Sequence, residues 1–174
     1  MLWRSRANGR HFWSNAPAAS IAAATASIGD HGFVPRLITI ARARGVSGYL
    51  GDGSNRWPAV HRLDAAHLFR LTVESAPAGT VVHAIAEEGV VTRAIAEVIG
   101  RRLNVLVVAI APEDAAEHFG FLAAFWGVDT PASSAWTREA MGWQPTQPGL
   151  LQDLDRGNYF RVPSATGRLA KDAA

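Results

Sequence analysis

The residues best suited to chemistry lie in one stretch, residues 51–64, which reads GDGSNRWPAVHRLD. A histidine titrates near neutral pH, so His61 is a candidate for proton transfer. The alternative, which the sequence favours, is a strand histidine that is hydrogen-bonded to the backbone and holds the loop. Asp64 stands where a helix begins, and it is explained more simply as a helix cap than as a catalytic acid.

Other combinations that commonly carry chemistry are missing from the sequence. Among the histidines, only His118 stands near a carboxylate at a suggestive spacing, and the pair with Asp114 is better explained as a helix surface. Ser133 and Ser134 lack the Gly-x-Ser-x-Gly turn that activates a serine nucleophile in hydrolases. The chain has no cysteine, which excludes disulfides and thiolate metal sites.

Composition and charge predict a soluble globular chain that does not bind nucleic acid. Of the 174 residues, 48% are hydrophobic and 18% are charged, and no apolar run is long enough to span a bilayer. The sequence pI is about 9.7. The positive charge lies at the front, because residues 1–47 carry six arginines and one acid, whereas residues 48–174 carry 11 basic and 14 acidic residues. A nucleic-acid interface would instead need a basic face on the folded part.

The hydrophobic periodicity predicts alternating helices and strands, followed by a helix-rich end. We expect helices over 33–45, 64–76, 92–103, 112–120, 131–141 and 148–157, strands over 46–50, 80–85 and 105–110, and a turn at Glu87-Glu88-Gly89. The second helix is expected to bury Ala65, Leu68, Phe69 and Thr72. The strand over 105–110 is a nearly continuous apolar run, so we expect it to be buried on both faces.

Four stretches, taken in order, resemble one protein family. They are GDHGFVP at 29–35, GDGSNRWPAVHRLDAA at 51–66, HAIAEEGV at 83–90 and MGWQP at 141–145. They resemble the C-terminal portion of the extended, atypical short-chain dehydrogenases/reductases, the NAD-dependent epimerase/dehydratase-like proteins. The resemblance implies an α/β fold: the C-terminal part of a Rossmann-like, doubly wound parallel sheet with a small α-rich substrate lobe. It also implies NAD or NADP as cofactor.

The residues that do the family's chemistry are not found in this sequence. Its cofactor is held by a glycine-rich turn between a strand and a helix, and only two glycines, twenty residues apart, precede residue 32. Its catalytic pair is Tyr-x-x-x-Lys, yet the two tyrosines, Tyr49 and Tyr159, have no lysine four residues on, and Lys171 is the only lysine. We therefore assign no catalytic, cofactor-binding or metal-binding residue and do not expect this chain alone to bind the dinucleotide.

The substrate side of the family's site is what this sequence could retain. In the family's nucleotide-sugar enzymes an arginine stands four residues before the motif histidine, where this chain has Trp57 next to Arg56. An indole cannot replace a guanidinium that binds phosphate, which favours a small and less charged substrate. The substrate-binding candidates are Phe33, Asn55, Arg56, Trp57 and His61. Each has an alternative as a packing, turn or solvated residue.

The front of the chain differs in character from the rest. Residues 1–28 are rich in arginine and serine and contain no acid, so they form either a non-family, disordered segment from a misassigned or frameshifted start or, less simply, a transit peptide. We expect a partial NAD(P)-binding and substrate-binding domain over 29–161 and a flexible tail over 162–174. The arginine bias, 16 of 17 basic residues, suggests G+C-rich coding DNA and a bacterial source.

Two functions follow from these observations. The first is a cytoplasmic NAD(P)-dependent oxidoreductase or epimerase acting on a small carbonyl or hydroxyl substrate, here truncated and inactive alone. The second is a non-enzymatic remnant that binds a small ligand or a protein through the surface of Phe33 and Trp57. Since the family's other sheet strands are missing, we also expect self-association through an exposed sheet edge or an aromatic surface.

Overall fold

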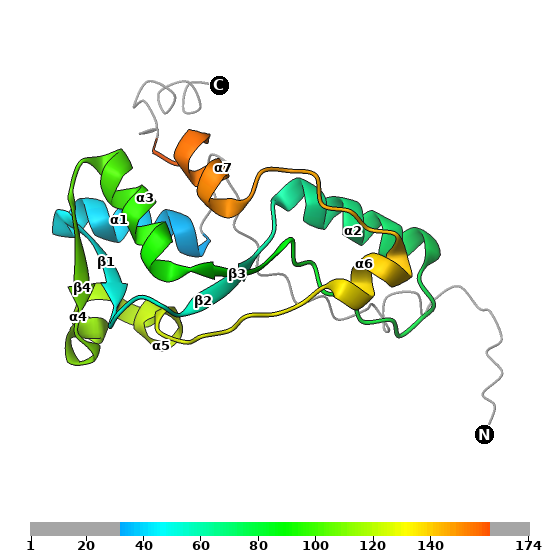
Figure 1. Ribbon diagram of the computed structural model, residues 1–174, viewed down its shortest axis with the longest axis horizontal. Helices are drawn as coiled ribbons and strands as arrows, with labels where there is room; N and C mark the ends of the chain where they lie inside the picture. Colours follow the sequence, from blue (N-terminus) through cyan, green and yellow to red (C-terminus); the bar gives the residue numbers. More distant parts are fainter. Residues whose placement is uncertain (1–31, 161–174) are drawn as a thin grey trace, which may run out of the picture.

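The structure, a computed structural model, describes residues 32–160, so the segments 1–28 and 162–174 and the first three residues of the first family motif, 29–31, lie outside the described residues. The described chain is elongated, with a small sheet and its helices at one end and two further helices at the other (Figure 1). The helices are α1 (Phe33–Arg44), α2 (Arg62–Ser75), α3 (Thr92–Leu103), α4 (Ala115–Phe119), α5 (Ala123–Trp126), α6 (Ala135–Met141) and α7 (Leu150–Arg156), with short 3-10 turns η1 (Pro112–Asp114) and η2 (Gly120–Leu122). The strands are β1 (Val46–Leu50), β2 (Arg56–Ala59), β3 (Glu87–Val91) and β4 (Leu106–Ile110).

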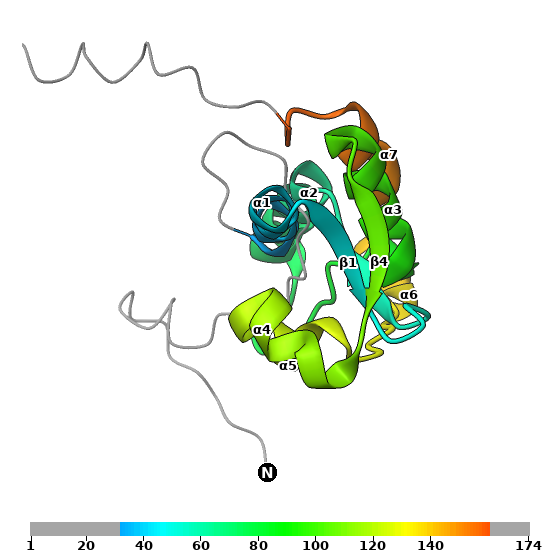
Figure 2. The same ribbon diagram turned by 90° about the vertical axis from the view of Figure 1, so that its left-hand side faces the viewer.

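Strands β1 and β4 form a parallel pair, in which Val46 stands opposite Leu106 and Leu50 opposite Ile110. A parallel pair needs a long crossover, and here everything from β2 to α3 lies between the two strands. Helix α1 lies beside β1 and contacts α3 and α4 (Figure 2). The parallel sheet with its helices confirms the predicted α/β class.

Small residues let helices lie close to both faces of the parallel pair. On one face α3 approaches so closely that a methyl group at Gly100 would collide with Val107, and the Ser47 hydroxyl donates to the carbonyl of Ala96 on α3 at 2.8 Å. On the other face Gly48 leaves room for the His118 ring of α4. A larger side chain at either glycine would push a helix off the strands.

Helices α1 and α3 end as predicted from the sequence. Gly45 caps α1 in the left-handed conformation, with φ of 70°, and its N–H donates to Ala41. Asn104 does the same for α3, with φ of 55°, which asparagine tolerates better than most residues.

Strands β2 and β3 form an antiparallel pair between the two ends of the molecule. The sequence-based prediction of a turn at Glu87-Glu88-Gly89 is wrong, because these residues begin β3 and pair with β2. Their carboxylates have partners elsewhere: that of Glu87 accepts the Leu150 N–H at 2.5 Å, and that of Glu88 accepts the Ser133 hydroxyl at 2.6 Å.

The buried side chains form two separate cores of unequal size. The larger core, which defines the sheet lobe, comprises Val34, Leu37, Ile38, Ala41, Ala59, Val90, Ile95, Val98, Ile99, Ala115, Phe119, Leu122, Trp126, Leu150 and Leu154. The smaller core, which defines the α2 lobe, comprises Val60, Ala65, Leu68, Val82, Ala84 and Trp143. The α2 lobe consists of α2, α6 and the segments 76–86 and 142–147.

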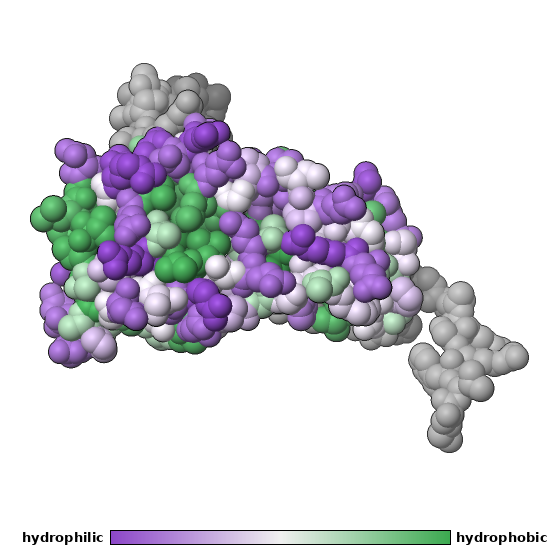
Figure 3. All heavy atoms as spheres, viewed as in Figure 1, coloured by the Kyte–Doolittle hydropathy of each residue, from purple (hydrophilic) through white to green (hydrophobic). Residues whose placement is uncertain are grey.

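Three further predictions about burial and strands are wrong. The segment 80–85 joins neither of the two described sheets, and it has only an isolated bridge at His83. The β4 strand is not buried on both faces, since Leu106 is 74% exposed. Hydrophobic side chains gather on the surface at the sheet end of the molecule (Figure 3). Phe69 of α2, expected in the core, is 57% exposed.

Ala65, Leu68 and Thr72 are buried along α2 as predicted. Across residues 32–160, no helix has both the length and the apolar character needed to cross a membrane.

Candidate functional site

The candidate site is an aromatic cluster where the start of α1, strand β2 and helix α5 meet. Phe33 lies edge-on to Trp57, with ring centroids 5.1 Å apart, and 6.3 Å from the ring of Phe125. Trp57 also contacts Trp126 edge-on at 5.3 Å. Phe33 and Phe125 are exposed, Trp57 is half-buried and Trp126 is buried, so the cluster runs from the core to the surface. The exposed rings offer an apolar wall to a ligand.

The polar edge of Trp57 is held by the protein. Its indole N–H donates to the Val128 carbonyl at 3.1 Å, which fixes the ring in its orientation. The half-exposed ring combines the two roles considered for it: it packs on its own surroundings and it presents apolar surface beside Phe33. In contrast, the indole nitrogen of Trp126 is buried without a hydrogen-bond partner among the described residues.

The Asn55 side chain links this cluster to the start of α3 by hydrogen bonds. Its amide N–H donates to the Trp126 carbonyl at 2.7 Å, and its amide oxygen accepts the Thr92 hydroxyl at 2.7 Å. The backbone N–H of Thr92 donates to the Asn55 carbonyl at 2.9 Å, which ties the start of α3 to the same loop. Both ends of the Asn55 amide are therefore engaged in positioning the site.

Arg56 is paired within the protein. Its guanidinium donates to the two carboxylate oxygens of Asp129, from Nε at 3.1 Å and from Nη2 at 2.9 Å, and its backbone N–H donates to the same carboxylate at 2.7 Å. The side-chain hydrogen bond raises the pKa of Arg56 and, together with the backbone N–H, holds the pKa of Asp129 below its usual value. The charge beside Trp57 is thus neutralised by a bidentate pair.

His61 lies apart from the aromatic cluster. It is the N-cap residue of α2, and its Nδ1 accepts the Leu63 backbone N–H at 3.2 Å. This is the backbone hydrogen bond that the sequence favoured over proton transfer, made at a helix start rather than within the strand. The structure brings together Phe33, Asn55, Arg56 and Trp57, and it places His61 in none of their contacts.

Asp64 corrects another sequence-based expectation. It does not cap α2, because His61 does. Instead, its buried carboxylate accepts the backbone N–H groups of Thr146 and Gln147, both at 3.0 Å. The Asp64 carbonyl accepts the Trp143 indole N–H at 3.0 Å. Asp64 therefore holds the 143–147 segment onto α2.

The sequence has an aromatic run at Phe119, Phe121, Phe125 and Trp126, which predicts core packing or, as the alternative, the wall of an apolar pocket or a dimer surface. Phe119 and Trp126 are buried, whereas Phe121 and Phe125 are exposed. Asp129 was not found from the sequence. It stands 73 residues from Arg56, and a lone acid in a loop carries no local signal.

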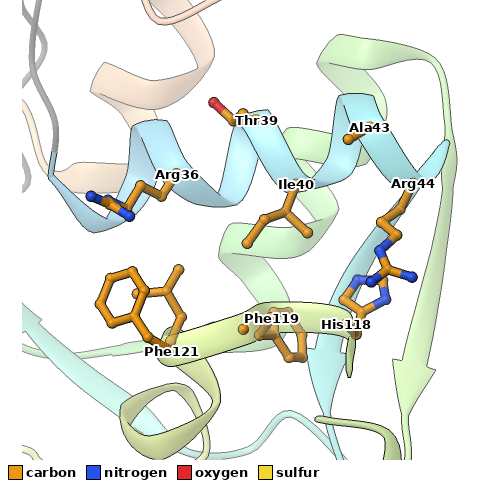
Figure 4. A pocket seen from close by; sticks show the side chains of 10 residues that line it. Arg36, Thr39, Ile40, Ala43, Arg44, His118, Phe119 and Phe121 are labelled. Atoms are coloured by element: carbon orange, nitrogen blue, oxygen red, sulfur yellow. The ribbon is translucent and has the colours of Figure 1, made fainter. Parts of the chain in front are cut away.

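A groove of about 500 Å³ lies between α1 and the α4–η2 segment (Figure 4). Its walls include Ile40, Phe119 and Phe121, and the Arg36 guanidinium lies 4.8 Å from the centre of the Phe121 ring. At one end Arg44 pairs with the carboxylate and carbonyl of Glu117. The groove is therefore apolar, with charged groups that are already engaged at both ends.

His118 stands at the Arg44 end of the groove with its Nε2 buried and without a partner among the described residues. Burial lowers the pKa of His118, and the nearby Arg44 lowers it further, against the opposing effect of Glu117. Since neither ring nitrogen is placed against an acid, this histidine is a packing residue over Gly48.

The described residues do not fit a dinucleotide. The turn after β1 leads into β2 rather than into a helix, so no helix N-terminus follows a parallel strand there. The Tyr49 ring lies 5.3 Å from the Arg93 guanidinium, and the Tyr159 hydroxyl donates to Asp153 at 3.1 Å, so neither phenol is placed for proton transfer. Within residues 32–160 no three histidine or acidic side chains are grouped for a metal ion.

Sequence comparison finds relatives but no described activity. No family model matches the chain. Uncharacterized protein C2A9.02 of Schizosaccharomyces pombe is 52% identical over 132 residues, which are 76% of this chain and 45% of that protein. Uncharacterized protein YLL056C of Saccharomyces cerevisiae is 53% identical over 131 residues, 75% of this chain and 44% of that protein. The chain thus spans less than half the length of the curated relatives it matches, and its bacterial source stays a prediction.

Solved structures identify the fold. The chain is similar to DesIV, a dTDP-glucose 4,6-dehydratase of Streptomyces venezuelae solved with NAD bound, with a TM-score of 0.57 and 17% identity over 76% of this chain and 39% of that one. This is part of the Rossmann-like epimerase/dehydratase fold. The epimerase Mth375 of Methanothermobacter thermautotrophicus agrees, with a TM-score of 0.54 and 15% identity over 71% of this chain and 35% of that one. The predicted fold class is confirmed, and the low identities limit the likeness to the fold.

Proposed function

We propose that this chain forms the substrate-binding portion of an NAD(P)-dependent oxidoreductase or epimerase of the short-chain dehydrogenase type. The observation that supports this most directly is the aromatic cluster of Phe33, Trp57 and Phe125, which presents apolar surface where α1, β2 and α5 meet. In the proposed enzyme this portion would hold the substrate, and NAD(P) would supply the hydride chemistry.

The substrate class follows from the chemistry of the cluster. Three aromatic side chains present apolar surface, while the adjacent Arg56 is neutralised by Asp129. A phosphate or sugar nucleotide would need an unpaired guanidinium at this position. The site therefore suits a small carbonyl or hydroxyl compound with an apolar body and little charge.

A chimaera tests this function. In the Saccharomyces cerevisiae relative, the 131 matched residues are replaced by those of this chain, and the purified protein is assayed with NADH and NADPH against a panel of small aldehydes and ketones. We expect turnover of apolar carbonyl compounds. Trp57→Ala should raise KM by about tenfold with a smaller change in kcat, because the indole binds substrate and takes no part in proton transfer. A matched control is Trp136→Ala, which removes an exposed tryptophan outside the cluster.

A chimaera that folds and binds NAD(P)H but turns over no carbonyl or hydroxyl compound would contradict the proposal. So would a Trp57→Ala variant with the same KM as the parent protein.

The second candidate function, a non-enzymatic binding module, is favoured by one observation: the exposed rings of Phe33 and Phe125 are already assembled in this chain alone. Titration of tryptophan fluorescence separates the two. The enzyme hypothesis expects no saturable binding of NADH or NADPH by the isolated chain. A module would bind a ligand tightly at the cluster, with affinity lost in Trp57→Ala, and would show no turnover in the chimaera.

A further inference from the structure

Strand β4 forms one edge of the parallel sheet, at the end of the molecule where hydrophobic side chains gather on the surface (Figure 1, Figure 3). Within residues 32–160, β4 pairs with β1 alone. The strand reads LVVAI and contains no charged residue and no proline, which are the residues that usually protect an edge strand from pairing with another chain. Leu106 is 74% exposed, and Ala109 is exposed as well. The outer edge of β4 is therefore apolar and unprotected.

The backbone of β4 has hydrogen-bonding groups that β1 does not use. The Gly51 N–H donates to the Ile110 carbonyl at 3.0 Å, so the backbone groups of Ile110 face β1. Along a strand the backbone groups of successive residues point to alternate sides, so those of Val108 also face β1, whereas those of Val107 and Ala109 face outward. No described residue bonds to the outward N–H and C=O groups of these two residues. Four backbone groups are thus left for another strand.

The β4 strand of a second copy would satisfy all four groups at once. When two β4 strands meet antiparallel around Val108, Val107 of each copy lies opposite Ala109 of the other, and each of these pairs exchanges two hydrogen bonds. Leu106 then lies opposite Ile110 of the second copy, on the same face of the joined sheet. This covers the side chain with the highest exposure among the large hydrophobic residues of the described part.

The neighbouring registers would need backbone groups that are already bonded. A shift of the pairing toward the start of β4 requires the N–H of Val105, which donates to the Gly100 carbonyl at 3.0 Å. A shift toward its end requires the carbonyl of Ala111, which accepts the Asp114 N–H at 3.0 Å. The antiparallel register around Val108 is therefore the one that costs no existing hydrogen bond.

The charges at the two ends of β4 favour the antiparallel orientation. Arg101 and Arg102 precede the strand and share one carboxylate, that of Asp155, at 3.0 and 4.0 Å, so this end keeps a positive charge. Glu113 and Asp114 follow the strand, are exposed and form no ion pair among the described residues. Antiparallel pairing brings the positive end of each copy beside the negative end of the other, whereas parallel pairing brings like charges together.

We propose that this chain forms a symmetric dimer in which the β4 strands of two copies pair antiparallel around Val108. The two parallel pairs then become one sheet of four strands, in the order β1-β4-β4-β1. Pairing of one edge with itself about a two-fold axis closes at two copies and does not extend into a fibre. The aromatic cluster of Phe33, Trp57 and Phe125 takes no part in this contact, so the dimer is independent of the proposed function.

Sedimentation equilibrium of the full chain measures the dimer. We expect the mass to rise with concentration to twice the 18.6 kDa of one chain, with a dissociation constant of about micromolar order, because one strand pair is a small interface. Ala109→Pro removes an outward N–H without touching the bonds to β1 and should raise the dissociation constant at least about tenfold. Leu106→Lys adds a charge to the edge and should do the same.

The matched control is Leu63→Lys, which alters a leucine of α2 that is 53% exposed and should leave the dissociation constant unchanged. Far-UV circular dichroism and the melting temperature show that each variant is folded. Leu106→Lys provides the test through an exposed side chain even where proline disturbs β4.

Disulfide cross-linking tests the register, since the chain has no cysteine of its own. Val108→Cys places two thiols in a non-hydrogen-bonded pair with Cα atoms about 4.5 Å apart, which a disulfide can span, so oxidation should give a covalent dimer. In Leu106→Cys the two thiols are offset by four residues, about 13 Å along the strands. This variant should remain a single chain on a denaturing gel after the same oxidation.

Five results would overturn the proposal. They are a monomer at every concentration, a dimer that neither edge variant weakens, equal cross-linking of Leu106→Cys and Val108→Cys, and oligomers larger than a dimer, which would mean that β4 pairs with a different edge. The fifth is a dimer that Phe125→Asp dissociates and the two edge variants do not, which would place the contact at the aromatic cluster.

Discussion

The sheet lobe and the α2 lobe contain similar kinds of residues but differ in how completely they enclose them. In the sheet lobe, β1 and β4 are covered by α3 on one face and α4 on the other, and fifteen side chains form its core. In the α2 lobe, six buried residues form the core, and the helix beside them leaves Leu63, Phe69 and Val73 exposed. The sheet lobe thus has a core more than twice the size of that of the α2 lobe, while both lobes leave large apolar side chains exposed.

The largest expected difference in stability between the two lobes follows from replacing one buried tryptophan in each. Trp126→Ala removes a fully buried ring from the sheet lobe and should cost about 3–5 kcal/mol of global stability. Trp143→Ala, also fully buried, should instead unfold the α2 lobe while the sheet lobe persists. Urea denaturation followed by hydrogen exchange of α2 and of β1 measures both.

Trp126→Phe serves as the control for the sheet lobe. It keeps an aromatic ring and removes an indole N–H that is buried without a partner among the described residues, so its cost should be much smaller than that of Trp126→Ala. Cooperative unfolding of both lobes together in Trp143→Ala would show that they are one unit.

Asp64→Ala should weaken only the α2 lobe. It leaves the Thr146 and Gln147 N–H groups without their acceptor, at a cost of about 1–3 kcal/mol. The measurement is the hydrogen exchange of α2, with Glu74→Ala, an exposed residue of the same helix, as the control. Identical exchange in Asp64→Ala and the parent chain would mean that the 143–147 segment is held by Trp143 alone.

Gly100→Ala should act on the sheet lobe alone. The added methyl group meets Val107 of β4 and should cost about 1–3 kcal/mol as α3 moves off the strands. The double variant Gly100→Ala/Val107→Ala makes room for that methyl group and should recover part of the loss. Thermal denaturation of the parent chain and both variants tests this, and a double variant less stable than either single change would contradict it.

The smallest expected effect is a pH dependence of the sheet lobe. The pKa of His118 is lowered in the folded chain, so the unfolded chain binds the proton more tightly. Stability is therefore fully present above the unfolded pKa of about 6.5 and is lost as the pH falls below it. His118→Phe should flatten the melting temperature between about pH 7 and pH 5 relative to the parent chain. An unchanged pH profile in His118→Phe would place the titrating group elsewhere.

Local signals explain which parts of this fold could be predicted from the sequence. Gly45 marked the end of α1, and the apolar spacing of Ile95, Val98 and Ile99 marked α3, because caps and helical periodicity lie within a few residues. In contrast, the sequence predicts a turn at the start of β3, because the strand character of these residues comes from pairing with β2, about 30 residues away. The apolar periodicity of α2 predicts that Phe69 is buried, but its side chain is exposed in the described part of the chain.

The candidate site was predicted in part. Phe33 and Trp57 were singled out and do lie together, since a loop beside a helix start was visible in the sequence. The charge state of the site was not predictable, because Asp129 meets Arg56 only through the fold. The sequence correctly predicted that His61 is hydrogen-bonded to the backbone. It did not predict that His61 lies at the start of α2 rather than in a strand.

The parallel pair of β1 and β4 also constrains the order of folding. Val46 and Leu106 are 60 residues apart, and the whole of α2 and the segment 76–86 lie inside the loop that their pairing closes. The entropy of closing a loop rises only slowly with its length, so the pair can form around an α2 region that is still unfolded. Such distant pairing makes folding slow, and it leaves the α2 region free to fold after the sheet lobe.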